Sequence, residues 1–552
     1  MRRMRALGIG AAGVLAVGAL TAAASASPDR HGGTGPNVIG QYKHIVVIYE
    51  ENHSFDNLYG TWGSVNGQRV DGLASADQVH TTQVAQNGDA YGCLLQNDVN
   101  LTSPTPLPTT CVDSAHGVAA SNFTNDPFKI DNYIAPTDKT CPAPGVFAAS
   151  GVLKNSPGAL PGGCTRDLVH RFYQEQYQLN GGLQNRYVTG SDAVGLTMGQ
   201  YDTKSLPIYD FLHGTHAPNY VIADHFFQAA FGGSFLNHQW LVAARSPIDT
   251  AAGPGGADAG LHSIVDSNGF PNKYPLYTPT NTPTNTTVKD AQLTQACDTP
   301  ANPNPDLNPN VACGDYAVNT IQPTNPPHAG APLLPLIDDT KYPNIGDRLS
   351  AKNIPWNWYS GGWNDAAAGH PGPLFQYHHQ PLNYFANYAP GQPGRTHLKD
   401  ETDFIKSAKN GTLPTVSFVK PYGAENEHPG YASEPDGSDH LVDLLKTILA
   451  GPQAKDTLVV VTYDEFGGQW DHVSPPGQGS STPGVHDKMG PGTRIPALVI
   501  SKSLKRSGVD HTSYDTTSIL ATIEHGLGLA PLSSRDAAVA DLHNAVRVGR
   551  GD

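Results

Sequence analysis

Continuous runs of apolar residues recur along the chain, and each has the length of a β-strand. These runs are apolar at successive positions, which is typical of strands buried on both faces of a mainly parallel sheet. The five clearest runs are His44–Tyr49, Tyr220–Ala223, Val416–Val419, Leu458–Tyr463 and Ala497–Ile500. We therefore expect these segments to form the central sheet of the protein.

Helical patterns lie between the apolar runs. The segments Ser438 to Ala450 and Tyr514 to His525 show helical spacing, and each opens with a residue that we expect to cap a helix. Alternation of strands and helices predicts an α/β sandwich around a mostly parallel sheet.

Two long stretches, at about 76–165 and 246–345, show no sustained periodicity and are rich in Pro, Asn, Thr and Gly. We interpret both as loop insertions that decorate one domain covering residues 27–552. No repeat of solenoid or propeller length is evident.

The N-terminal segment has the pattern of an export signal. Basic residues at the start precede an apolar stretch from Ala6 to Ala22, and the small residues Ala24-Ser25-Ala26 follow. We predict a signal peptide over residues 1–26, with a membrane anchor as the alternative, and a secreted or extracytoplasmic protein without stable membrane insertion. The pair Arg2-Arg3 also permits the twin-arginine route.

All six cysteines fall within the two insertions. An even number in an exported chain favours disulfides over metal ligation. Fifteen pairings are open, and closing the shortest loops gives the hypothesis Cys93–Cys111, Cys141–Cys164 and Cys297–Cys313.

The charge balance argues against a nucleic-acid partner. The chain has 34 Lys and Arg residues against 49 Asp and Glu residues, which gives a net charge of −15. It has no run of basic residues that could follow a phosphate backbone. The 23 histidines are many for this length, and histidine binds phosphate or metal near neutral pH.

Carboxylate and amide side chains follow two of the predicted strands. Glu51 and Asn52 come after the first strand, and Asp464 and Glu465 come directly after the strand that ends at Tyr463. Ligands in open α/β sheets bind beyond the carboxyl ends of strands. Adjacent carboxylates there repel one another unless a cation neutralises them. We therefore predict a metal site, against the alternative of two solvated acidic loops.

A hydroxyl and several histidines complete the candidate chemistry. Gly232-Gly233 lets the backbone approach a ligand closely, and the adjacent Ser234 offers a nucleophile, although such a sequence is usually a turn. Four histidines in loop-like settings suit the binding of a phosphoryl group and protonation of a leaving oxygen. They are His170, His378, His379 and His428.

With these motifs the chain resembles the bacterial phosphoesterase family of phospholipases C and acid phosphatases, in the alkaline phosphatase superfamily. The matching stretches occur in order along the chain: IVVIYEENHSFDNLYG (45–60), DLVHRFYQEQYQLNGG (167–182), ADHFFQAAFGGSFLNHQ (223–239), HHQPLNYF (378–385), ENEHPG (425–430) and VTYDEFGGQWDHVSPP (461–476). The resemblance implies an alkaline-phosphatase-like α/β sandwich.

The resemblance also implies roles for individual residues. One divalent metal ion of unknown identity would be held by Glu51, Asn52, Ser234, Asp464 and Glu465. Ser234 would be the nucleophile, and the four histidines would surround the phosphoryl group. Asp471 and His472 would lie next to the metal ligands and position them without binding the metal.

Serine at position 234 favours the acid phosphatase branch, because the phospholipases C of the family tend to carry threonine there. Glu465 stands where some acid phosphatases have aspartate, so its carboxylate reaches one methylene farther. We expect hydrolysis of phosphate monoesters through a phosphoserine. Alternatives are a phospholipase C acting on phosphatidylcholine-like diesters and a non-catalytic secreted binding protein. A sulfatase would need a Cys/Ser-x-Pro-x-Arg sequence, which the chain lacks.

Overall fold

The computed structural model divides the chain into two units, residues 1–36 and residues 37–552. The first unit lies outside the described residues. The described residues are 39–94, 111–116, 118–132, 168–191, 194–271, 290–297, 308–319, 325–328, 335–429, 431–479 and 481–551.

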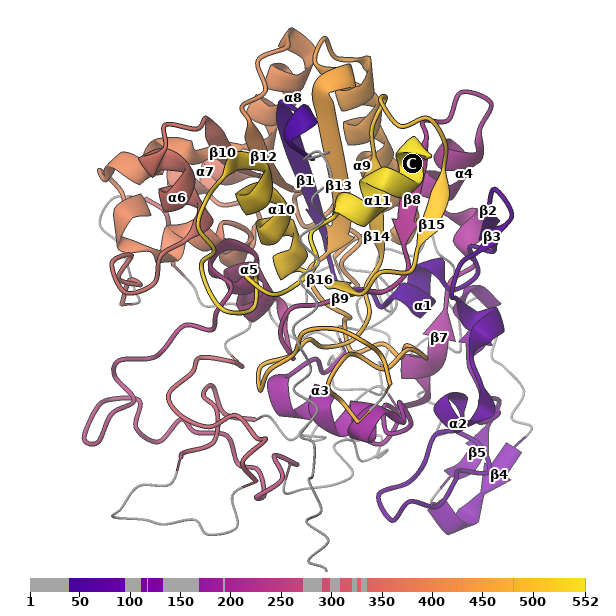
Figure 1. Cartoon of the computed structure of the whole chain (residues 1–552). Coiled ribbons are helices and arrows are strands. Elements are labelled where there is room, and N and C mark those ends of the chain that lie inside the picture. The colour runs from indigo at the N-terminus through magenta and orange to yellow at the C-terminus, as the bar shows by residue number, and fades with distance from the viewer. Residues whose placement is uncertain are drawn as a thin grey trace, which may run out of the picture. The chain divides into compact units, whose positions relative to one another are not determined.

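An eight-stranded sheet forms the centre of this unit (Figure 1). Its strands, in spatial order, are β11 (Leu398–Asp400), β10 (Trp356–Ser360), β12 (Val416–Lys420), β1 (His44–Glu50), β13 (Thr457–Tyr463), β14 (Ala497–Ile500), β8 (Tyr220–Ala223) and β15 (Gly508–Asp510). All neighbours are parallel except for the two pairs that involve β14. The prediction of a mostly parallel central sheet is confirmed.

All five predicted apolar runs are strands of this sheet, and their central residues are buried. The run at β14 is antiparallel to both of its neighbours, which its apolar pattern does not reveal.

Helices pack against the sheet, which makes the unit an α/β sandwich. The helix α8 contacts β10, β11 and β12, while α11 contacts β8 and β15. The longer helices are α3 (Phe172–Leu179), α4 (Pro207–His213), α5 (Ser234–Ala243), α6 (Ile345–Ala351), α8 (Glu401–Asn410), α9 (Glu434–Ala450), α10 (Thr517–Leu527) and α11 (His543–Arg550). Shorter helices are α1 (Phe55–Tyr59), α2 (Gln78–Thr81) and α7 (Trp363–Ala367).

The predicted starts of two helices are wrong. The helix α9 begins at Glu434, where the Ser433 hydroxyl accepts a hydrogen bond from the Asp436 backbone N–H, so Ser438 lies inside the helix. Tyr514 belongs to the short strand β16 (Tyr514–Asp515), which pairs with β9 (Phe226–Phe227), and α10 begins three residues later. The first turn of α9 is polar, with Glu434 and Asp436, so the apolar spacing begins inside the helix. Before α10 the apolar spacing extends back into β16.

The disulfides Cys93–Cys111 and Cys297–Cys313 are present, as predicted. Cys141 and Cys164 lie outside the described residues. Short elements occur in the first insertion, namely β4 (Cys111–Asp113), β5 (Val118–Ser121) and β6 (Phe128–Lys129), which pairs with β7 (Gly199–Gln200). A further hairpin consists of β2 (Ser64–Val65) and β3 (Gln68–Arg69). Within the described ranges, no helix has the length and apolar character needed to cross a membrane.

Candidate active site

The carboxyl ends of β1 and β13 bring the two acidic motifs together. The strands are parallel, and Glu50 lies opposite Tyr463, so the residues that follow each strand are neighbours. The Asn52 backbone N–H donates to Asp464 Oδ1 at 3.2 Å, and Asn52 adopts a φ of 48°. The sheet register therefore places Glu51 and Asn52 beside Asp464, as the sequence motifs predict.

The helix α5 supplies Ser234 as its first residue. Its hydroxyl donates to Glu465 Oε1 at 3.3 Å. A Cβ added to Gly232, whose φ is +94°, would lie 2.9 Å from the Phe172 backbone nitrogen. One added to Gly233 would lie 3.0 Å from the His170 ring. The two glycines thus allow α5 to start against the segment that carries His170.

The four predicted histidines lie around this cluster. His379 Nε2 is 2.8 Å from one oxygen of Glu51, and His428 Nε2 is 3.8 Å from the other. His170 Nε2 lies 3.4 Å from Glu465 Oε1. The rings of His378 and His379 are 4.6 Å apart, edge to face. All four side chains are buried, and the structure brings them together with the predicted ligand residues.

Two residues of this cluster have no role in the sequence analysis. Lys420, the last residue of β12, is fully buried, and its Nζ lies 2.6 Å from Glu51 Oε1 and donates to the Glu50 carbonyl. His238 stacks on His379 at 5.6 Å and lies 3.7 Å from Asp464 Oδ2. His238 comes four residues after Ser234 in α5, a spacing that places both on one helix face.

Burial and neighbouring charges set the pKa values of the acidic groups. Burial acts to raise the pKa of Glu51, but Lys420 and His379 outweigh burial and hold this pKa well below its usual range. For Asp464, burial and the charge of Glu51 outweigh the effect of Lys420 and raise its pKa to about 8. Burial outweighs the charge of Glu51 and lowers the pKa of His379 to about 4.

The donor atoms in this cluster fit a divalent cation. Asn52 Oδ1 and Asp464 Oδ2 are buried and accept no hydrogen bond within the described residues. Such oxygens are costly to bury unpaired and are the ligands that hard cations prefer. Glu51, His238 and His379 also offer donor atoms that all lie within 4.8 Å of one another.

A buried charged network joins the segments that follow β1 and β13. His472 Nδ1 lies 2.5 Å from Asp56 Oδ2, and Arg494 binds Asp471 at 3.0 Å and Asp56 at 3.1 Å. The Asp56 backbone N–H donates to Asp471 Oδ2. This network joins the segment that follows β1 to the segment that follows β13 and so helps to hold the two motifs in place.

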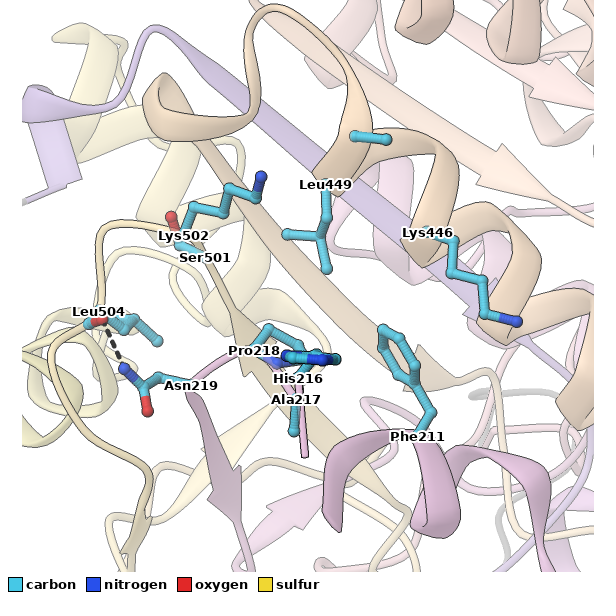
Figure 2. Close-up of a pocket in the computed structure, with 11 residues that line it drawn as sticks. Phe211, His216, Ala217, Pro218, Asn219, Lys446, Leu449, Ser501, Lys502 and Leu504 are labelled. Carbon is cyan, nitrogen blue, oxygen red and sulfur yellow. Dashed lines mark hydrogen bonds between the residues drawn. The ribbon is translucent and has the colours of Figure 1, made fainter. Parts of the chain in front are cut away.

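A cavity of about 540 Å³ lies at the other edge of the sheet, between the residues that precede β8 and those that follow β14 (Figure 2). Phe211, Leu449 and Lys502 are among the residues that line it. None of the predicted site residues does so. The candidate active site is therefore defined by its converging polar groups rather than by this cavity.

Comparisons with known proteins agree with this geometry. The model of the phosphoesterase family matches residues 42–530, so the chain belongs to that family. It is a hydrolase that acts on phosphoric ester bonds.

Three relatives illustrate the similarity. Phospholipase C B of Mycobacterium tuberculosis is 24% identical, over 96% of this chain and 83% of the relative. Phospholipase C A of the same organism is 23% identical, over 93% of this chain and 78% of the relative. A non-hemolytic phospholipase C of Burkholderia pseudomallei is 30% identical over 33% of this chain and 29% of its own length.

Among solved structures, an alkaline phosphatase superfamily protein from Vibrio parahaemolyticus overlaps 35% of this chain and 50% of its own. The identity is 15% and the TM-score is 0.22.

Proposed function

We propose that the protein is an acid-phosphatase-type enzyme that hydrolyses phosphate monoesters, with Ser234 as its nucleophile. The position of the Ser234 hydroxyl supports the proposal most directly, because it lies at the start of α5 and 3.3 Å from a Glu465 oxygen. Backbone N–H groups at a helix start and the helix dipole favour the negative charge of a phosphoryl group at this point.

The metal is the second part of the proposal. The side chains that would hold one divalent ion are Glu51, Asn52, Ser234, Asp464 and Glu465. Such an ion would supply positive charge that favours an ionised serine hydroxyl and a negatively charged phosphoryl group. The unpaired Asn52 and Asp464 oxygens support this assignment.

Each of the chain's own residues at the site would carry out one part of the reaction. Glu465 accepts the hydrogen bond of Ser234 and lies where it can take its proton as the oxygen attacks phosphorus. The bond between phosphorus and the ester oxygen breaks, and His428 gives that oxygen a proton. Water then attacks the phosphoserine, releases phosphate and restores the hydroxyl. His170, His378 and His379 would surround the phosphoryl oxygens.

Phospholipase C activity is the second candidate, and the relatives favour it. The Mycobacterium tuberculosis proteins that align with nearly the whole chain are named phospholipases C. On a phosphatidylcholine-like diester, the same attack by Ser234 would release the diacylglycerol alcohol. The serine at position 234 favours the monoesterase.

We also propose that residues 1–26 direct export of the protein. The two disulfides support an extracytoplasmic location, because disulfides persist in oxidising compartments.

Initial rates on p-nitrophenyl phosphate and on phosphatidylcholine, from acidic to neutral pH, test the proposal. The wild-type protein should cleave the monoester faster, and Ser234→Ala should lose at least about 1,000-fold in kcat while melting like the wild type. A faster release of phosphocholine would overturn the monoesterase proposal. A Ser234→Ala variant with near-normal rates would exclude Ser234 as the nucleophile.

A further inference from the structure

A second cluster of side chains that are able to bind a metal lies at the carboxyl ends of β8 and β15. The strands β8 and β15 are parallel and end in matching sequences, Ala223-Asp224-His225 and Val509-Asp510-His511. Because Ala223 lies opposite Asp510 in the register, Asp224 and His511 emerge side by side.

Three donor atoms meet at Asp224. His225 Nδ1 lies 3.1 Å from Asp224 Oδ1, and His511 Nδ1 lies 2.9 Å from the same oxygen. Both contacts are hydrogen bonds in this structure. Tetrahedral zinc with bonds of about 2.0–2.1 Å separates neighbouring ligand atoms by roughly 3.3 Å, so these spacings need to widen only slightly to admit an ion. One donor atom each of Asp224, His225 and His511 lies within 4.8 Å of the other two.

The surroundings of His225 match the environment of a metal-bound histidine. Its second ring nitrogen, Nε2, lies 3.3 Å from the Asp71 carboxylate. Metal-ligating histidines usually give their other N–H to a carboxylate, which fixes the tautomer and the ring orientation. The remaining Asp224 oxygen, Oδ2, accepts the Asp71 backbone N–H at 2.8 Å, so the carboxylate is also held in place.

A network of charged side chains connects this cluster to Asp471. His472 links Asp71 to Asp56, and Arg494 links Asp56 to Asp471. Together with Asp224, this network contains four carboxylates. Arg494 and His472, whose pKa the carboxylates of Asp56 and Asp71 raise to about 9 against the effect of burial, supply two positive charges.

We propose that Asp224, His225 and His511 form a second cation site, of the class that binds Zn²⁺, separate from the candidate active site. Two imidazoles and one carboxylate are typical ligands of Zn²⁺ and Co²⁺, whereas the oxygen-rich set around Asp464 suits harder cations. His511 is 55% exposed and Asp224 is fully buried, so the site is open to solution on one side. A bound ion would tie the ends of β8 and β15 to the segment that carries Asp71.

Metal content and thermal stability test this site without reference to catalysis. The full-length protein is stripped with chelator, dialysed against Zn²⁺ and assayed for metal per chain, in parallel with His225→Ala/His511→Ala and with His370→Ala, a control histidine that is exposed and outside the cluster. We expect the double variant to hold one equivalent of Zn²⁺ less than the wild type and to lose the rise in Tm that Zn²⁺ causes. His370→Ala should behave like the wild type.

Equal Zn²⁺ content and equal Tm shifts in the double variant and the wild type would overturn the proposal. A single variant, His511→Asn, keeps the test valid if the double variant does not fold, because it changes only a half-exposed ligand. Asp464→Asn distinguishes the two sites, since it leaves the second site's Zn²⁺ in place whether or not the proposed active-site metal exists.

Discussion

At the scale of single residues, the candidate active site depends on buried charges that neutralise one another. Glu51 is fully buried and ionised because Lys420 and His379 lie within 2.8 Å of its oxygens. For Asp464, burial and the charge of Glu51 outweigh the effect of Lys420, and its pKa rises to about 8. The structure thus contains one carboxyl group with a lowered pKa and one with a raised pKa at the place where a cation is proposed.

Replacing Lys420 should show that the stability of the fold depends on the neutralisation of the Glu51 charge. Lys420→Met leaves Glu51 buried without its nearest cation, and we expect a loss of about 3–5 kcal/mol in the free energy of unfolding, measured by denaturant titration in chelator. Lys341→Met is the control, because Lys341 pairs with Asp338 on the surface and should lose at most about 1 kcal/mol. Equal losses for both variants would contradict the account.

The pair of His472 and Asp56 should make stability depend on pH. The pKa of His472 is raised to about 9 in the folded protein, above its ordinary value of about 6.5. Its stabilising effect is therefore complete below pH 6.5 and is lost as the pH rises through 9. We expect His472→Gln to cost about 3 kcal/mol at pH 6 and much less at pH 10.

Denaturant titrations at both pH values measure this difference, with His525→Gln as the control. His525 faces Asp541 but is 55% exposed, so solvent screens the pair and its replacement should matter little. A cost for His472→Gln that is constant or larger at pH 10 would show that protonation of His472 does not stabilise the fold.

At the scale of elements, the start of α5 determines where Ser234 lies. The Gly232 backbone N–H donates to Glu175 Oε2 at 2.6 Å, and the packing against Phe172 leaves no room for a side chain. Gly-Gly-Ser by itself predicts a turn, and only the fold shows that this turn begins a helix against the segment that carries His170.

Gly232→Ala should therefore impair both stability and catalysis. Gly88→Ala is a matched control, because Gly88 has a φ of +91° against +94° for Gly232 but has no atom within 4 Å of an added Cβ. We expect Gly88→Ala to cost about 1–2 kcal/mol from backbone strain alone. Gly232→Ala should cost more, and a shift of Ser234 by about 1 Å should lower kcat about 100-fold. Equal stability and kcat in the two variants would contradict this role for Gly232.

At the scale of the whole molecule, the sheet explains what the sequence can and cannot reveal. Apolar runs identify β1, β8, β12, β13 and β14 because both faces of these strands are buried. They do not identify β10, whose Trp356–Ser360 segment mixes polar Asn357 with aromatic residues. The direction of β14 depends on packing, so the sequence does not reveal it either.

The same limit applies to the site. The acidic motifs, Ser234 and the four histidines are recognisable from local sequence and from resemblance to the family. Lys420 and His238 cannot be recognised in this way, because their local sequence does not show that the fold places them beside Glu51 and Asp464. The Asp224, His225 and His511 cluster likewise depends on the pairing of β8 with β15.

The most direct test of the central claim is to trap the covalent intermediate. The wild-type protein is mixed with p-nitrophenyl phosphate, quenched in acid within the first turnovers and mapped by peptide mass spectrometry, beside Ser234→Ala. The account predicts phosphate on Ser234 of the wild type and on no residue of the variant. Phosphate on a different residue, or turnover by Ser234→Ala at the wild-type rate, would contradict it.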